Sequence, residues 1–166
     1  MVGMSSTHSA AGATAASAAA PVVDVLALEN QVCFALAVAS RSVIGLYRPV
    51  LEPLGLTHPQ YLVMLALWER DERSVRELGA VLQLEPATLS PLLKRLEASG
   101  LVDRRRNAAD ERKLDVTLTP AGRALRAQAE KVPVRMMEIL GMQVQELQAV
   151  QTSLRSMIAA ATAAGD

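Results

Sequence analysis

The fold is decided by residues 74–120, which read SVRELGAVLQLEPATLSPLLKRLEASGLVDRRRNAADERKLDVTLTP. Ser74 with Glu77 three residues later forms a capping box, which predicts a short helix through Leu82. A tight turn at residues 83–85 leads to a second helix with the i, i+3, i+4, i+7 spacing of one buried face. The leucines of that face are Leu89, Leu92, Leu93 and Leu96. Two helices joined by so short a turn are typical of a helix-turn-helix.

The second helix has two possible starting points. A start at Pro86 places Pro91 inside the helix, where the missing N–H costs up to about 3 kcal/mol. A start with Thr88 as the N-cap places Pro91 in the first turn, at little cost, so we expect the later start. At the other end, Gly100 followed by Leu101 predicts a Schellman stop.

After Gly100 the hydrophobic period changes from helical to alternating. Residues 114–118 alternate apolar and polar side chains, which indicates a half-buried strand, and residues 101–106 can pair with it. Thr119 and Pro120 then predict the start of another helix. Because an isolated hairpin is only marginally stable, it must pack on the two helices before it. The predicted fold class is therefore mainly α with a small β-hairpin, a winged helix-turn-helix.

The rest of the chain predicts helices on both sides of this core. Residues 1–22 form an Ala/Ser-rich tail without amphipathic spacing, which we expect to be disordered. Apolar spacing predicts a long helix from Asp24 to about Tyr47, ended by the prolines that follow. Two long helical stretches, separated near Gly141, run to the C-terminus.

We expect residues 23–166 to form a single domain with a central lobe and flanking helices. The winged-helix lobe is predicted at residues 57–119. The helices in residues 23–52 and 120–163 carry more apolar surface than one small domain can bury, so we expect them to hold two copies together as a homodimer.

Composition excludes several classes of protein. The 166 residues hold 17 Lys and Arg against 17 Asp and Glu, so the chain is not a polycation that coats nucleic acid by bulk charge. Cys33 is the single cysteine, which excludes an intrachain disulfide and any thiolate-rich metal centre. Two histidines, His8 and His58, are too few for a His-based metal site, so we expect neither metal nor cofactor.

The sequence has neither a membrane-spanning apolar run nor the basic segment of a signal peptide, so a cytoplasmic protein without a membrane partner is expected.

The neutral total hides a basic element at residues 94–113, which hold seven cations and four anions. On a helical wheel, Lys94 and small residues point away from the leucines, and such a face fits the major groove of DNA. Arg112 at the hairpin tip is expected in the adjacent minor groove, and Asp110 could either hold the tip or orient Arg112. The candidate DNA contacts are Thr88, Ser90, Pro91, Lys94, Arg95, Arg105, Asp110 and Arg112. An ordinary solvated face is the alternative for a charge run alone, but the helices and hairpin around it favour DNA.

These residues carry a resemblance to a known family. The stretch from Ser74 to Gly122, with the wing sequence Asp110-Glu111-Arg112, resembles the DNA-binding core of the MarR family of bacterial repressors. Residues 26–130 resemble its organic-hydroperoxide-sensing OhrR branch. The matching pieces are Leu28-Glu29-Asn30-Gln31-Val32-Cys33-Phe34-Ala35-Leu36, Tyr47-Arg48-Pro49, Leu51-Glu52-Pro53-Leu54-Gly55-Leu56-Thr57, Pro59-Gln60-Tyr61 and Thr88-Leu89-Ser90-Pro91-Leu92-Leu93-Lys94-Arg95.

The resemblance implies that Cys33 is a peroxide-reactive thiol and that Tyr47 is one of its hydrogen-bond donors. Oxidation to a sulfenic acid would be followed by a further bond that deforms the dimer and releases DNA. The chain departs from the branch at Ala37 and His58, where tyrosines are usual. His58 can donate a hydrogen bond in place of tyrosine, or it can simply be a partly buried residue at a helix start. A lone cysteine on an apolar helix can also be an inert core residue.

Spacing adds a constraint on this candidate site. Cys33 and Tyr47 are 14 residues apart, or about 21 Å along a straight helix, so they meet only if the helix breaks or if Tyr47 comes from another subunit. With no second cysteine, an intersubunit disulfide of the two-cysteine type is impossible. Oxidised Cys33 could bond a small thiol, form a sulfenamide, over-oxidise or cross-link to another Cys33.

We therefore expect a homodimeric repressor, not an enzyme, that binds a pseudopalindromic operator and is released when Cys33 is oxidised. Its partners would be double-stranded DNA, an organic hydroperoxide and a low-molecular-weight thiol. One alternative is a MarR-type repressor released by a small apolar or phenolic ligand. Another is a one-cysteine thiol peroxidase.

Overall fold

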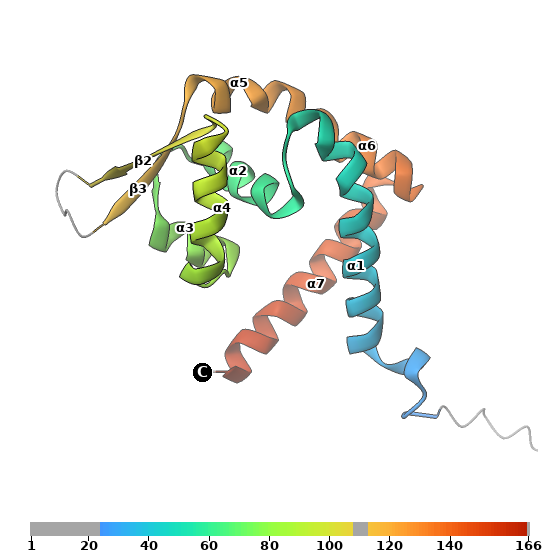
Figure 1. Cartoon of the computed structure of the whole chain (residues 1–166). Coiled ribbons are helices and arrows are strands. Elements are labelled where there is room, and N and C mark those ends of the chain that lie inside the picture. Colours follow the sequence, from blue (N-terminus) through green and yellow to red (C-terminus); the bar gives the residue numbers. More distant parts are fainter. Residues whose placement is uncertain (1–23, 108–112, 166) are drawn as a thin grey trace, which may run out of the picture. The chain divides into compact units, whose positions relative to one another are not determined.

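The computed structural model describes residues 24–107 and 113–165 (Figure 1). The predicted tail at residues 1–22 and the wing-tip residues Asp110 and Arg112 lie outside the described residues. The chain divides into two compact units, with the division between Val38 and Ala39.

Helix α1 (Val32–Leu51) begins and ends later than the sequence predicted. The segment before it forms a short 3-10 helix, η1 (Leu28–Asn30). The Asn30 amide donates to the Asp24 carbonyl at 2.8 Å, and the Asp24 carboxylate accepts from the Leu26 N–H at 3.0 Å. Such local side-chain bonds compete with the helical ladder and explain the later start. At the other end Pro49 lies inside the final turn, where its missing N–H removes a single hydrogen bond.

Capping boxes begin the next two helices, and the one at Ser74 was predicted. Helix α2 (His58–Glu69) follows Thr57, whose N–H donates to the Gln60 side chain at 2.8 Å. Helix α3 (Val75–Leu82) follows Ser74. Between α1 and α2 lies a second 3-10 helix, η2 (Glu52–Leu54).

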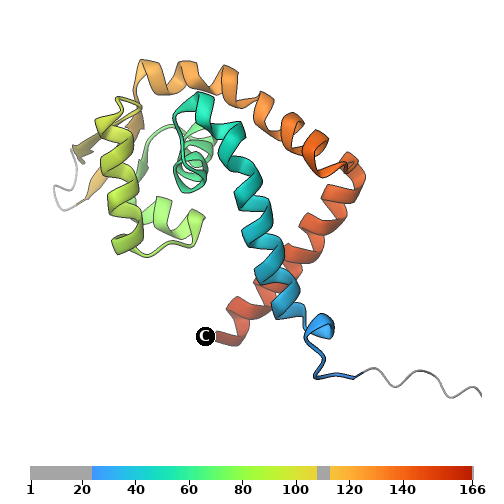
Figure 2. The same ribbon diagram turned by 45° about the vertical axis from the view of Figure 1, so that its right-hand side comes forward.

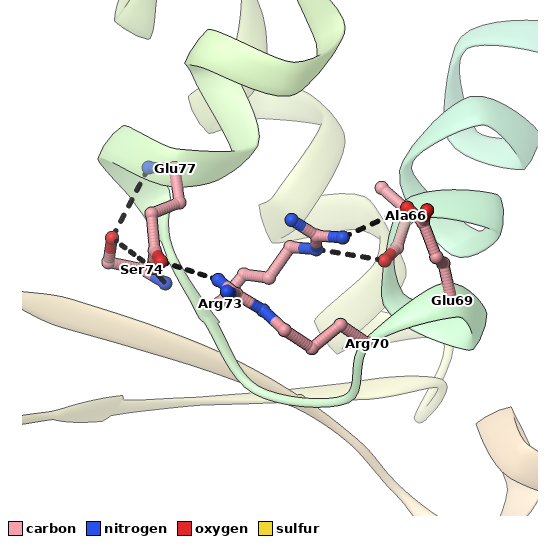
Figure 3. Close-up of polar contacts among 6 residues, drawn as sticks. All are labelled: Ala66, Glu69, Arg70, Arg73, Ser74 and Glu77. Atoms are coloured by element: carbon pink, nitrogen blue, oxygen red, sulfur yellow. Dashed lines mark hydrogen bonds and ion pairs between the residues drawn. The ribbon is translucent and has the colours of Figure 1, made fainter.

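The start of α3 belongs to a polar network that ties it to α2 (Figure 3). Glu77 accepts from the N–H and the hydroxyl of Ser74 at 2.7 and 2.8 Å and also pairs with Arg70. These bonds lower the pKa of Glu77 to about 2, with the Ser74 backbone bond as the largest cause. Beside it, the buried Arg73 guanidinium donates to the Ala66 carbonyl at 3.0 Å and pairs with Glu69.

Helix α4 (Pro86–Ala98) begins at Pro86, so the prediction of a start after Thr88 was wrong. The Glu85 carbonyl accepts from the N–H groups of both Thr88 and Leu89 at 3.0 Å, which closes the first turn ahead of Thr88. Proline suits the first helical position because its φ is already helical. Pro91 therefore lies in the helix interior.

The predicted Schellman stop closes α4. The N–H of Leu101 donates to Leu96 O at 3.0 Å and that of Gly100 to Glu97 O at 2.9 Å. Gly100 adopts a φ of +71°, a left-handed conformation that glycine reaches without a steric penalty. The chain thereby leaves α4 directly into the wing.

The sheet has three strands where the sequence predicted two. Strands β2 (Val102–Arg106) and β3 (Leu114–Leu118) form the expected antiparallel hairpin, with Val102 opposite Leu118. The additional strand, β1 (Arg73–Ser74), pairs with the other edge of β3, so the order is β1-β3-β2. A two-residue strand is too short to show an alternating pattern, which explains why the sequence did not reveal it.

Three helices follow the sheet (Figure 2): α5 (Pro120–Ala129), α6 (Lys131–Leu140) and α7 (Val144–Gly165). Thr119 caps α5 as predicted, accepting from Gly122 N at 3.0 Å. The predicted division at Gly141 is present, but the first stretch also breaks at Glu130. Pro133 accounts for this break because it cannot donate to the carbonyl four residues before it.

One hydrophobic core joins these elements within the second unit. Leu89, Leu93 and Leu96 of α4 are all buried, and Val102 and Val116 bring the hairpin into the same cluster. The core therefore fixes α4 and the base of the wing together.

The segment Val32–Leu54 is long and apolar enough to cross a membrane by length and composition, although no such span was expected. Arg41 and Arg48 interrupt its apolar run, which is why a search for an unbroken run missed it. Core helices of soluble proteins and N-terminal signal sequences pass the same test, and only 6% of this window is buried within the described residues.

Candidate functional site

The candidate DNA-reading face lies on the side of α4 opposite its buried leucines. Its five predicted residues are all exposed: Thr88, Ser90, Pro91, Lys94 and Arg95. This matches the helical wheel, because the earlier start of α4 changes the length of the helix but leaves its faces unchanged. The exposed surface combines short side chains with two cations, so a polyanion can approach the helix closely.

The structure separates the arginines of the wing by strand alternation. Arg104 lies on the same strand face as buried Val102, and its side chain is 20% exposed. Arg105 lies on the opposite face, is 79% exposed and pairs with Asp103 at 3.5 Å. Arg105 is therefore accessible to a partner, as predicted, whereas Arg104 is directed to the protein.

Arg104 is one of the seven cations of residues 94–113, but its partner is a residue of the protein, which the sequence did not predict. Arg104 Nε donates to Glu97 Oε2 at 2.9 Å, and a second guanidinium nitrogen contacts the same oxygen. This hydrogen bond lowers the pKa of Glu97. The position of Arg104 two residues after an apolar strand residue was the signal that could have indicated an inward direction.

The predicted redox residues are divided between the two units: Cys33 lies in the first, and Tyr47 and His58 lie in the second. Cys33 is exposed on α1, so it is not an inert core cysteine within the described chain. Tyr47 and His58 lie in the second unit, where their ring centroids are 4.9 Å apart. Tyr61 extends this cluster, with its ring 6.1 Å from that of Tyr47.

Burial sets the protonation of these rings. It raises the pKa of Tyr47, so the hydroxyl keeps the proton that a hydrogen-bond donor needs. It lowers the pKa of His58, so the neutral imidazole is favoured at neutral pH. A neutral imidazole still has one N–H to donate, but it supplies no positive charge to a nearby thiol.

The second unit also contains a groove of about 480 Å³ between the end of α1 and the α5–α6 segment. Val50, Leu54 and Val132 make its floor apolar, while Lys131 and Arg135 place two cations at it. Within residues 24–107 and 113–165, no group of His, Cys, Asp or Glu side chains could hold a metal ion.

Comparison with known proteins connects this architecture to transcriptional regulators. A family model described as "Transcriptional regulator SarA/Rot" matches residues 45–128. The organic hydroperoxide resistance transcriptional regulator of Bacillus subtilis is 36% identical over 135 residues, which cover 81% of this chain and 92% of that protein.

Solved structures agree with this relationship. Reduced AbfR bound to DNA matches with a TM-score of 0.67 and 34% identity, over 79% of this chain and 91% of AbfR. Bordetella bronchiseptica BpsR, whose DNA binding is regulated by 6-hydroxynicotinic acid, matches with a TM-score of 0.65 and 29% identity, over 76% and 98% of the two chains. The chain belongs to the MarR family of winged-helix transcriptional regulators, among relatives of the organic hydroperoxide regulators, and is a DNA-binding protein rather than an enzyme.

Proposed function

We propose that the protein is a homodimeric repressor that binds a pseudopalindromic operator and releases it when an organic hydroperoxide oxidises Cys33. The observation that carries the redox proposal is an exposed cysteine on α1, in a chain whose Tyr47 and His58 rings lie against each other. The names of its relatives support it: one is a regulator of organic hydroperoxide resistance, and another was solved in a reduced state on DNA.

DNA contact is assigned to two parts of the winged-helix lobe at residues 57–119. The exposed face of α4 enters a major groove with Thr88, Ser90, Pro91, Lys94 and Arg95. Arg105 of the wing contacts the flanking backbone, and Arg112, with Asp110 to orient it, would enter the adjacent minor groove. In a dimer, two such lobes about 34 Å apart would reach successive major grooves.

The sensing chemistry is a nucleophilic displacement at the peroxide. The Cys33 thiolate attacks one peroxide oxygen, the O–O bond breaks, and the alkoxide leaves and takes a proton to become an alcohol. Cys33 is then a sulfenic acid. A low-molecular-weight thiol condenses with it to give a mixed disulfide and water, and a second thiol restores the reduced protein.

The donors reach Cys33 most simply from a second copy of the chain. Cys33 and Tyr47 both lie in α1, 14 residues apart, which corresponds to about 21 Å of helix. A thiol shared between subunits would couple its oxidation to the distance between the two DNA-reading lobes. Such a dimer would bury the exposed apolar side chains in the ranges 23–52 and 120–163, for example Leu36 and Leu154.

Operator binding before and after treatment with cumene hydroperoxide tests the proposal. The probe is the duplex that the reduced protein selects from a random library, at one stated salt concentration. Wild type should lose binding and regain it after dithiothreitol, whereas Cys33→Ser should bind throughout. Release of both proteins, or of neither, would exclude Cys33 as the sensor. Sedimentation at several concentrations tests the dimer independently.

The groove at α6 supports a second candidate function, a repressor released by a small ligand. Its apolar floor and two cations suit an aromatic or apolar molecule with an acidic group, and BpsR is a relative regulated by such a compound. Calorimetric titration with 6-hydroxynicotinic acid, using wild type and Lys131→Ala, separates the two functions. Under this alternative Cys33→Ser would still respond to ligand.

A further inference from the structure

Helix α4, the proposed DNA-recognition helix, and strand β2 of the wing are joined by residues 99–101, with Gly100 at the centre. Gly100, with its φ of +71°, lies between the end of α4 and the start of β2. Glu97 is three residues before it and Arg104 four residues after it, and their side chains pair across the bend. The ion pair therefore closes a short loop centred on glycine, the residue type with the greatest backbone conformational freedom.

The Glu97–Arg104 pair reaches the hairpin at the middle of β2, between the hydrogen bonds at its base and those farther out. At the base of the hairpin, Thr119 donates from its hydroxyl to Gly100 O at 2.6 Å and from its N–H to Leu101 O at 3.1 Å. Farther out, Asn107 joins the strands through Asp115 at 2.6 Å. Arg104, in the middle of β2, joins this part of the hairpin to Glu97 of α4.

We propose that the Glu97–Arg104 pair is a positioning device that fixes the angle of the wing on the recognition helix, so that both reach DNA as one rigid body. This inference rests on the proposed contact between the wing and DNA. In this proposal neither side chain contacts DNA. The Arg104 guanidinium is hydrogen-bonded to Glu97, and the Glu97 carboxylate would repel phosphate.

The same geometry argues against a role in stability alone. Both partners are at least partly exposed, and such pairs typically contribute little to the free energy of unfolding. Their placement across a glycine bend gives them a larger effect on direction than on stability. The hydrogen bond from Arg104 also lowers the pKa of Glu97, so the carboxylate stays charged at neutral pH.

Single substitutions distinguish positioning from charge by the sign of their effects. If charge alone matters, Glu97→Ala removes an anion near DNA and tightens binding, whereas Arg104→Ala removes a cation and weakens it. Positioning predicts that both weaken operator binding, by about tenfold each. Both should also lower the salt slope by about one, because a displaced wing loses phosphate contacts. The charge-swapped double variant Glu97→Arg/Arg104→Glu should restore affinity and slope.

Three further variants control the measurement. Glu97→Gln keeps an acceptor for Arg104 and should bind closer to wild type than Glu97→Ala. Glu138→Ala breaks an exposed pair with Arg135 on α6 and should leave operator binding unchanged. Opposite shifts for the two single variants, unchanged binding, or weaker binding with an unchanged salt slope would each overturn the proposal.

The wing contact itself is tested in the same titrations with Arg105→Ala and Arg112→Ala, the two wing arginines proposed to touch DNA. If they lower the salt slope while Glu97→Ala does not, the ion-pair proposal fails and the wing contact stands. If neither lowers the slope, the wing does not touch DNA and both proposals fail.

Discussion

Adding one methyl group at Gly122 should destabilise the protein more than any other single methyl addition at a described glycine. Gly122 is in the first turn of α5, and a Cβ there would lie 2.0 Å from the Leu101 carbonyl oxygen. Ordinary carbon–oxygen contacts are about 3.3 Å, so the two backbones must separate by about 1.3 Å. Neither moves freely, because Leu101 O accepts from Thr119 N at 3.1 Å and Gly122 O accepts from Trp68 Nε1 at 2.9 Å.

The expected cost follows from these contacts. Overpacking of a tight site costs about 1–3 kcal/mol, and weakening the Trp68 hydrogen bond adds about 1 kcal/mol. Gly122→Ala should therefore lower the free energy of unfolding by roughly 2–4 kcal/mol, which is a drop of roughly 5–15 °C in Tm for a chain of this size. That is a large fraction of the stability of a typical domain.

Urea unfolding followed by far-UV circular dichroism measures the effect, with Gly45→Ala as the matched control. A Cβ at Gly45, inside α1, meets no atom within 4 Å in the described chain. The same methyl group should there raise stability by up to about 1 kcal/mol through helix propensity. Equal midpoints for Gly122→Ala and wild type would refute the reasoning, since they would mean that the junction of wing and α5 yields without cost.

Three other perturbations have definite signs. Pro91→Ala should raise the free energy of unfolding by about 2 kcal/mol, and the urea midpoint with it, because restoring an interior helical hydrogen bond outweighs the added freedom of the unfolded chain. A lower midpoint would contradict an interior location of Pro91. The folded pKa of Glu77 is about 2 against an ordinary value of 4.5, so its contribution to stability is present above pH 4.5 and is lost as the pH falls toward 2. Glu77→Gln should flatten that part of the acid-unfolding curve, and an unchanged curve would exclude the Glu77 network as its cause. His58 has a pKa lowered by burial, so the unfolded chain binds the proton first and stability falls as the pH drops below the ordinary value of 6.5. His58→Gln should remove this dependence as the pH falls below the ordinary value, and a slope that persists would assign it to another group.

Local sequence rules predicted much of the lobe because the residues that decide its ends are neighbours in the chain. The capping box at Ser74, the Schellman stop at Gly100 and the cap at Thr119 each close through bonds within a few residues. Hydrophobic period then placed the buried face of α4 and the alternation of β3. The exposed side chains proposed to read DNA follow directly from that face.

The features that were missed depend on contacts between residues distant in sequence or on competition between local bonds. Strand β1 exists because Arg73 pairs with Val116, and two residues carry no pattern of their own. The earlier start of α4 shows that proline at a first helical position outweighed the cost estimated for Pro91. Arg104 looked like one more surface cation because its partner, Glu97, lies in the preceding helix.

The apolar periodicity of the flanking helices is present in the structure, but much of that apolar surface is exposed within the described residues. In α7, Leu147, Val150, Leu154 and Met157 recur at three and four residues, as a buried helical face requires, and the last three of them are exposed. Leu36 on α1 is likewise exposed despite its apolar spacing. An apolar period predicts which face of a helix is buried, but it does not say whether the same chain or a second copy of the chain covers that face. The mismatch between period and burial in both flanking segments is therefore an argument for the proposed dimer that is independent of any relative.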